Sequence, residues 1–266
     1  IDSDSVILEW NLQAERTFGW TRNEVIGRDM VDIIIPERFR SAHRQGLRRY
    51  LATGDAPLLN QRLELSALHR DGHELPVEIT IRPTGTPQAP RFHAFMHDIS
   101  GRQRAIWRLT AQTSAAAALV AATTLADAAP KVLAAICKAL GWTIGTLWLL
   151  DADGATLRFA QYWIVPEAAV GHFLGASRGA TFAAGVGLPG RVLDTGKATW
   201  ISDVASAENF PRAAAAALDG LHAAFAFPIR KGAQVLGVVE FFSSSINEPD
   251  QDLLNMMETL GSLLGQ

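Results

Sequence analysis

The sequence predicts an α+β protein of two domains, each an antiparallel sheet flanked by helices, joined by a long connecting helix. The length of 266 residues exceeds the usual size of one domain. Alternating apolar runs meet at Asp-Gly pairs, residues 71–72 and 153–154, which is typical of β-hairpins. An alanine-rich segment without proline separates two such regions. We therefore expect domains at residues 1–100 and 127–266 and the connecting helix at 101–126.

The first domain should contain short helices, one long helix and three strands. The segment SVILEWN reads as a strand, and LQAERTFGWTRNEVIG reads as short helices that end at Gly27. The segment PERFRSAHRQGLRRYLATG predicts a helix with Pro36 in its first turn and Gly54 at its end. The runs QRLELSALHR, HELPVEITIRP and RFHAFMHDIS predict three strands.

The connecting segment carries apolar or small side chains at spacings of three and four, which suits one face of a helix. These residues are Ile106, Leu109, Thr113, Ala116 and Val120. Such a face pairs with a second copy of the chain or packs on its own domain. We expect a homodimer through this helix and the C-terminal helix.

The second domain should begin with the helix APKVLAAICKALG and end with the helix EPDQDLLNMMETLGSLLG. Between them lie two hairpins, one of which turns at Lys231-Gly232, and a glycine-rich stretch. That stretch contains GVGLPG without the Lys-Ser/Thr ending of a phosphate-binding loop, so nucleotide binding is not expected there.

Composition excludes several classes of protein. The net charge of −3, from 24 basic and 27 acidic residues, argues against nucleic-acid binding. The single cysteine, Cys137, excludes an intramolecular disulfide and a thiolate zinc cluster, and its apolar neighbours predict a buried thiol. The longest uncharged run, residues 109–125, is too weakly apolar to cross a membrane, and no signal peptide is visible. We expect a cytoplasmic protein without membrane contact.

The long helix of the first domain carries the leading candidate for a ligand site. At 100° per residue, Phe39, His43, Leu47 and Tyr50 fall within one arc, whereas most of the arginines lie on the remainder. His43 should therefore face the element that the helix packs against. It is either a packed, hydrogen-bonded core residue or a metal ligand.

Four other histidines carry less weight. His69 and His73 flank the turn at Asp71-Gly72 and should be exposed to solvent. His93 and His97 share one strand face, where a metal pair lacks an evident third ligand.

The sequence resembles two families of sensory domain. Residues 1–100 resemble a PAS domain in WNLQAERTFGWTRNEVIGRDMVDIIIP, in RDGHELPVEITI and in the closing DIS followed by Arg102. The second domain is similar to GAF domains of bacterial sensor kinases in GVGLPGRVLDTGKATWISDV, NFPRA, AFAFPI, VLGVVEFFS and LGSLLGQ. Both resemblances imply a pocket between sheet and helices that takes a small-molecule ligand.

The helix around His43 also resembles that of oxygen-sensing heme-PAS kinases, in which a histidine on this helix ligates the iron. The resemblance implies heme as cofactor, His43 as its axial ligand, and a distal wall of Leu59, Ile79 and Ile81. Arg62 would then bind a heme propionate or the bound gas. The residues just after His43 depart from that pattern, and PAS domains without heme share this helix, so both readings of His43 stay open.

The GAF resemblance implies a second pocket. The residues expected at or near it are Phe182, Arg191, Trp200, Phe210 and Phe225. The alternative is that these aromatic side chains simply fill the core.

The resemblances together imply a sensory and dimerisation module without turnover of its own. Its output domain, in the same chain, would be a histidine kinase or, alternatively, an enzyme of cyclic-di-GMP metabolism. A catalytic fragment such as a hydrolase is disfavoured, because no nucleophile-elbow or metal-ligand spacing is present.

Overall fold

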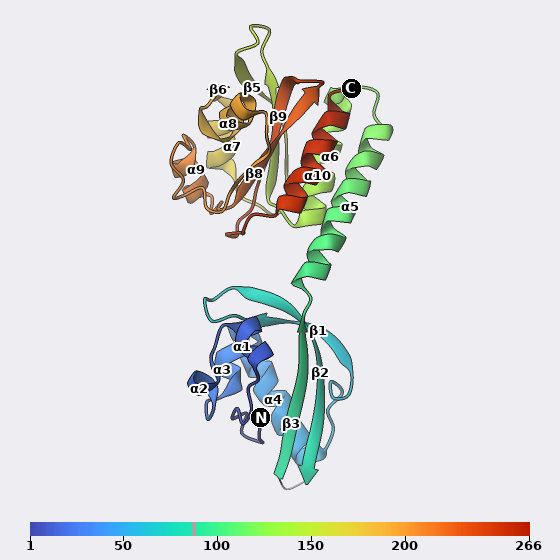
Figure 1. Cartoon of the computed structure of the whole chain (residues 1–266), viewed down its shortest axis with the longest axis vertical. Coiled ribbons are helices and arrows are strands. Elements are labelled where there is room, and N and C mark those ends of the chain that lie inside the picture. Colours follow the sequence, from blue (N-terminus) through green and yellow to red (C-terminus); the bar gives the residue numbers. More distant parts are fainter. Residues whose placement is uncertain (87–88) are drawn as a thin grey trace. The chain divides into compact units, whose positions relative to one another are not determined.

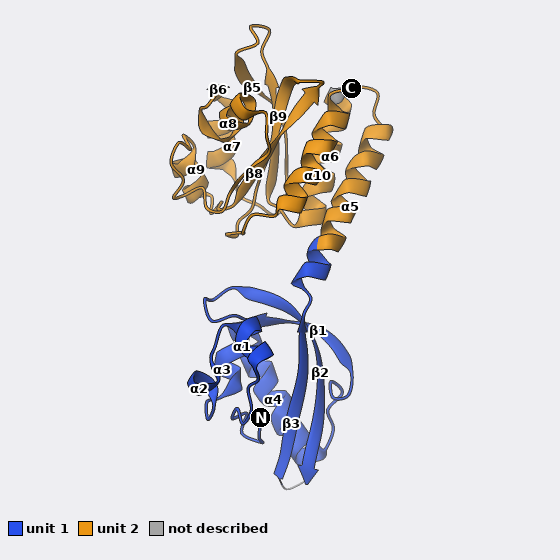
Figure 2. Cartoon of the chain, viewed as in Figure 1, with its two compact units in different colours: residues 1–104 blue, residues 105–266 orange. Residues whose placement is uncertain are grey.

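The computed structural model describes residues 1–86 and 89–266 of the chain. They form two compact units, residues 1–104 and 105–266 (Figure 2). Both combine helices with an antiparallel sheet, of three strands in unit 1 and six in unit 2, which confirms the predicted α+β class (Figure 1).

Four helices open unit 1, and local capping sets their ends. They are α1 (Leu12–Phe18), α2 (Arg22–Val25), α3 (Met30–Ile34) and α4 (Glu37–Thr53). Asn11 accepts a hydrogen bond from the Ala14 amide at the start of α1, and Asp29 does the same for Val31 in α3. The long helix α4 ends at Gly54, which has a left-handed φ of 72°.

The sheet of unit 1 has the order β1 (Arg62–Leu68), β2 (Glu74–Thr86), β3 (Ala89–Asp98). Its register places Leu75 and Val77 on one face, where they join the core formed with α1 to α3. We call this the inner face. Glu78, one residue on from Val77, lies on the opposite, outer face, because successive side chains alternate along a strand.

The segment SVILEWN does not form the predicted strand. Val6 makes only an isolated bridge to Asp29. The amide of Ile7 donates to the Arg28 carbonyl, and the carbonyl of Ile7 accepts from Gly27. These neighbouring partners satisfy the backbone of the segment, so its apolar side chains enter the core without a regular strand.

The connecting helix is α5 (Ser100–Val120), and α6 (Leu125–Leu140) follows it. Residue 126, the expected end of the connection, thus lies inside α6. The start of α5 is anchored in unit 1, where Ile99 is buried and its amide donates to the Pro76 carbonyl at 3.1 Å. Asp98 accepts a hydrogen bond from the Ser100 amide at 2.8 Å.

The sheet of unit 2 has the strand order β6-β5-β4-β9-β8-β7 (Figure 1). Two hairpins supply its four central strands, as the Asp-Gly and Lys-Gly turns predict. The elements after α6 are β4 (Ile144–Leu150), β5 (Thr156–Ile164), α7 (Gly171–Arg178), β6 (Thr181–Ala183), α8 (Gly187–Thr195), β7 (Thr199–Ile201), α9 (Ala213–Leu218), β8 (Ala224–Lys231), β9 (Gln234–Phe242) and α10 (Gln251–Leu264).

A separate hydrophobic core covers each face of this sheet. The first core includes buried residues of α5, α6 and α10. The second includes residues of α7, α8 and α9 and the loops around them. Among the described residues, no helix is both long enough and apolar enough to cross a membrane.

Candidate functional site

The face of α4 that packs on the domain contains three of the four residues predicted for it, with Arg40 in place of Phe39. The partly buried residues are Arg40, His43, Leu47 and Tyr50, at spacings of three and four. Phe39 is 45% exposed and its ring lies beneath the guanidinium of Arg38, so its predicted place in the pocket is wrong. The helix is rotated so that Arg40, rather than Phe39, faces the rest of the domain.

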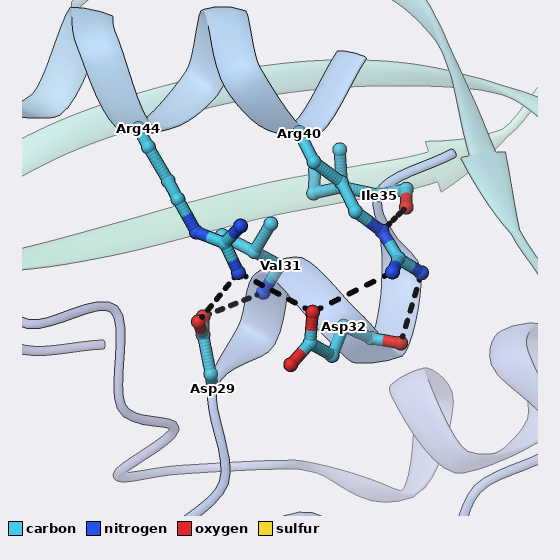
Figure 3. A network of polar contacts seen from close by, with 6 residues as sticks. All are labelled: Asp29, Val31, Asp32, Ile35, Arg40 and Arg44. Carbon is cyan, nitrogen blue, oxygen red and sulfur yellow. Dashed lines mark hydrogen bonds and ion pairs between the residues drawn. The ribbon is translucent and has the colours of Figure 1, made fainter. Parts of the chain in front are cut away.

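Two arginines of α4 hold the helix against α3 (Figure 3). Arg40 donates from Nε to the Ile35 carbonyl at 3.1 Å and lies 3.6 Å from the Asp32 carboxylate. Arg44 lies 3.2 Å from Asp29 and 3.3 Å from Asp32. These arginines are therefore anchors of the helix as well as part of its solvated face.

His43, on the same helix, is partly buried. Its Nδ1 atom is buried and has no hydrogen-bond partner. Burial lowers the pKa of the imidazole, Asp29 opposes the shift, and Arg44 adds to it. His43 is therefore held neutral, with one ring nitrogen unpaired. A neutral imidazole with an unpaired nitrogen is the form that ligates metals.

The other residues predicted for this pocket do not all lie on the inner face of the sheet of unit 1. Ile79 and Ile81 alternate with Glu78 and Thr80, so they lie on the inner face, and Asn60, next to Leu59, donates to the Ile81 carbonyl. Arg62 pairs with Thr80 in the register and forms an ion pair with Glu78.

Arg62 therefore lies on the outer face, 69% exposed, and its predicted place in the pocket is wrong. A slip of one residue reverses the face that a strand residue occupies, and only the observed register fixes it. Tyr50 does reach the inner face, where its ring meets that of Phe92 at 5.4 Å.

The residues predicted for the second pocket lie on opposite faces of the sheet of unit 2. Phe182 and Phe210 belong to the core beneath α7, α8 and α9. Trp200 and Phe225 stack on each other in the core beneath α6 and α10, so their predicted place in the same pocket is wrong. On α8, Arg191 has buried Nε and Nη2 atoms without a hydrogen-bond partner.

A buried charged pair, which sequence reasoning missed, lies at the centre of the core beneath α7, α8 and α9. The side chains of Arg212 and Glu240 are 3% and 0% exposed and lie 2.7 Å apart. Glu240 also accepts hydrogen bonds from Thr146 at 2.9 Å and from the Trp148 indole at 2.8 Å. Arg212 donates to the Ser177 hydroxyl at 2.9 Å. Every carboxylate oxygen is thus paired, as a buried charge requires.

Aromatic rings enclose the guanidinium of Arg212. Its Cζ atom lies between 4.8 and 5.5 Å from five ring centroids, those of Trp148, Phe173, Phe182, Phe210 and Phe242. Such a cage, with a carboxylate at its base, has the chemistry of a site for an organic cation. Here the chain's own arginine fills the cage.

The segment NFPRA positions this arginine. Asn209 donates to the Gly185 carbonyl at 2.8 Å and accepts from the Gly187 amide at 3.1 Å, which joins the segment to the glycine-rich loop. A Cβ atom at Gly187 would lie 2.9 Å from the Phe182 ring. The glycines of GVGLPG therefore allow close packing around the cage, and the amide of Gly187 is already bonded within the protein.

Two known proteins are each similar to part of this chain. An uncharacterized protein of Azorhizobium caulinodans is 41% identical over 111 residues, which is 41% of this chain and 15% of that protein. The sensor protein FixL of Bradyrhizobium diazoefficiens is 32% identical over 109 residues, 41% of this chain and 21% of FixL. The chain thus matches a small part of each relative's length.

Solved structures agree on the fold of unit 2. The GAF domain of a phosphoenolpyruvate-protein phosphotransferase from Coxiella burnetii superposes with a TM-score of 0.50 at 16% identity, covering 59% of this chain and 90% of that one. The family model of the GAF domain matches residues 122–266, more than half of the chain, and that of the PAS domain matches residues 1–101. The chain therefore belongs to the GAF-domain family, with a PAS domain ahead of the GAF domain, and carries the sensory domains of a signalling protein.

Proposed function

We propose that this chain is a cytoplasmic sensory and dimerisation module that controls an output domain of a larger signalling protein, a histidine kinase. The observation that carries the proposal is α5, a continuous helix of 21 residues that begins at the end of the PAS sheet and continues into the GAF unit. Such a helix can transmit a change in one domain to the next. The likeness to the sensor protein FixL supports a kinase as the output. The alternative output is an enzyme of cyclic-di-GMP metabolism.

The surface of α5 supports dimerisation. One face packs on the GAF unit through Ala111 and Ala115, which are fully buried. The apolar residues expected to form the pairing face remain outside: Ile106 is 54% exposed and Leu109 is 61% exposed. Leu109 also lines a groove between α5 and α10 together with Met256. An exposed apolar stripe on a helix is typical of a surface that pairs. We propose a second copy of the chain as its partner.

Replacing Leu109 by glutamate should convert the dimer to a monomer. A carboxylate in the centre of a paired apolar stripe would lose its water without gaining a partner. We expect sedimentation of the wild-type chain at micromolar concentration to show a dimer, and that of Leu109→Glu to show a monomer with an unchanged circular dichroism spectrum.

The matched control is Leu218→Glu, at a leucine of α9 that is 70% exposed. It should remain a dimer. A wild-type chain that sediments as a monomer at high micromolar concentration would overturn the pairing through α5.

We further propose that the chain has no turnover of its own. Its single thiol supports this, since Cys137 is buried and burial raises the pKa of that thiol far above neutral pH. The thiolate is the nucleophilic form, so Cys137 is a structural residue of the core. In the GAF domain, the cage that could hold a substrate is filled by Arg212.

A second candidate function is gas or redox sensing through heme at His43. The buried, unpaired Nδ1 atom and the neutral state of the ring fit an axial ligand of iron. Arg62 does not fit the propionate contact, because it pairs with Glu78 on the outer face. Heme would therefore need another cation for its propionates.

Hemin reconstitution tests this second candidate. If His43 ligates the iron, the wild-type chain should develop a Soret band that His43→Ala lacks. His97→Ala, at an exposed histidine of β3, should keep the band. The absence of a band in the wild-type chain, or its survival in His43→Ala, would exclude axial ligation by His43.

A further inference from the structure

We propose that His69, Asp71 and His73, at the turn between β1 and β2, form a binding site for a divalent transition-metal ion of the zinc, nickel or copper class. One ligand atom from each of these residues lies within 4.8 Å of the other two. The sequence His-x-Asp-x-His places two imidazoles and one carboxylate on a single hairpin turn. Two histidines with one carboxylate are a common donor set for such ions.

The three donor atoms lie close together. The Nδ1 atom of His69 lies 2.9 Å from Oδ1 of Asp71, and Nδ1 of His73 lies 2.5 Å from the same oxygen. The Asp71 amide nitrogen lies 3.3 Å from the same Nδ1 of His69, a long contact that an ion bound to this nitrogen would replace. In the metal-free protein a proton on an imidazole nitrogen makes the hydrogen bond to the carboxylate. One metal ion would take the place of these protons and bind all three atoms.

The turn holds these residues in place before any ion binds. The amide of His69 donates to the His73 carbonyl at 2.8 Å, and that of Gly72 donates to the His69 carbonyl at 3.0 Å. The His73 amide donates to Asp71 at 3.1 Å. A ligand set that is fixed in this way loses little conformational entropy on binding.

The end of α1 packs against His69 and the hairpin. A Cβ atom at Gly19, the cap of α1, would lie 2.5 Å from Nε2 of the His69 ring. The glycine, with a φ of 76°, therefore makes room for the imidazole and covers its Nε2 side, so that Nδ1 is the nitrogen that faces the turn. The amide of Arg70 donates to the Phe18 carbonyl at 2.9 Å and ties the hairpin to α1.

The local charge does not oppose a cation. The guanidinium of Arg70, the one arginine of the turn, is paired with Glu24 at 2.9 Å and lies 5.0 Å from the centroid of the Trp20 ring. Asp71 and His73 are 61% and 58% exposed, so an ion can enter from solvent. Three protein ligands leave the remaining coordination positions to water or to a partner's ligand. The site is independent of the function proposed above.

Zinc titration of the untagged 266-residue chain, in competition with a chromophoric chelator, tests the site. We expect one zinc ion per chain, and His73→Ala should lose more than about tenfold in affinity, because a direct ligand matters at least as much as the residues that orient ligands. Asp71→Asn should also weaken binding. The control, His97→Ala, removes an exposed histidine outside the turn and should bind zinc as the wild type does.

A second measurement separates loss of the site from loss of the fold. The circular dichroism spectrum and thermal unfolding of His73→Ala, in the presence of a strong chelator, should match those of the wild type, because the ring of His73 contacts only His69 and Asp71 among the contacts described. Stoichiometric zinc binding that persists in His73→Ala, or binding by the wild type only at millimolar zinc, would overturn the proposal.

Discussion

Replacing Glu240 by alanine should lower the free energy of unfolding of the GAF domain by about 3–5 kcal/mol, the usual cost of leaving one buried charge without its partner. In Glu240→Ala the guanidinium of Arg212 would keep its aromatic cage and the Ser177 hydroxyl but lose its counter-ion. The indole of Trp148 and the hydroxyl of Thr146 would lose their acceptor at the same time. Urea denaturation followed by tryptophan fluorescence measures the change.

The double variant Arg212→Met, Glu240→Leu distinguishes the pair from a simple loss of packing. With both charges absent, no ion is left unpaired, so we expect much of the stability to return. As a surface control, Asp151→Ala breaks the pair with the exposed Arg158 and should change stability little. A double variant less stable than Glu240→Ala would show that lost packing, and not the unpaired charge of Arg212, causes the destabilisation.

Replacing Gly261 by alanine should destabilise the GAF domain by about 3 kcal/mol, the upper range for inserting a methyl group into a packed core. Helix α10 lies so close to β8 that a Cβ atom at Gly261 would sit 2.0 Å from the Pro228 carbonyl oxygen. One turn later, a Cβ atom at Gly265 would lie 1.9 Å from the Arg230 carbonyl oxygen. The backbone of β8 cannot yield as a side chain would, so the helix must move away from the sheet.

The matched control is Gly175→Ala, on α7, where nothing lies within 4 Å of the added methyl group. Alanine there should stabilise the helix by roughly 0.5–1 kcal/mol, the usual gain over glycine inside a helix. The two substitutions are chemically identical and should have opposite signs. Equal effects in thermal denaturation would show that packing of α10 on β8 does not decide the result.

Local sequence signals predicted most of the elements. The Asp-Gly turns fixed the hairpins β1–β2 and β4–β5, because only a few residue pairs suit such tight turns. Pro36 and Gly54 bounded α4 for the same kind of local reason. The segment SVILEWN shows the limit. Its composition suits a strand, but whether a strand forms depends on a partner edge, and here residues 27–30 supply the partners instead.

The candidate sites depended more than the helices and strands did on contacts between residues far apart in the sequence. A helical wheel placed Phe39 and His43 in one arc, but only packing against α3 decided that Arg40 turns inward and Phe39 outward. The predicted pockets also mixed the two faces of each sheet, because strand register is set by contacts between segments far apart in sequence. Arg62 and the pair Trp200 and Phe225 were misplaced for this reason.

By itself, the sequence determined the two sensory domains, the helix between them and the turn that brings His69, Asp71 and His73 together, since each depends on residues close in the chain. The sequence also contains a sign of the buried pair: Glu240 is a lone acid within the apolar run VLGVVEFF and so needs a partner when it is buried. Only the tertiary structure shows that this partner is Arg212, which lies 28 residues away in the sequence. The reason is that a buried charge is neutralised by whichever cation the packing brings to it.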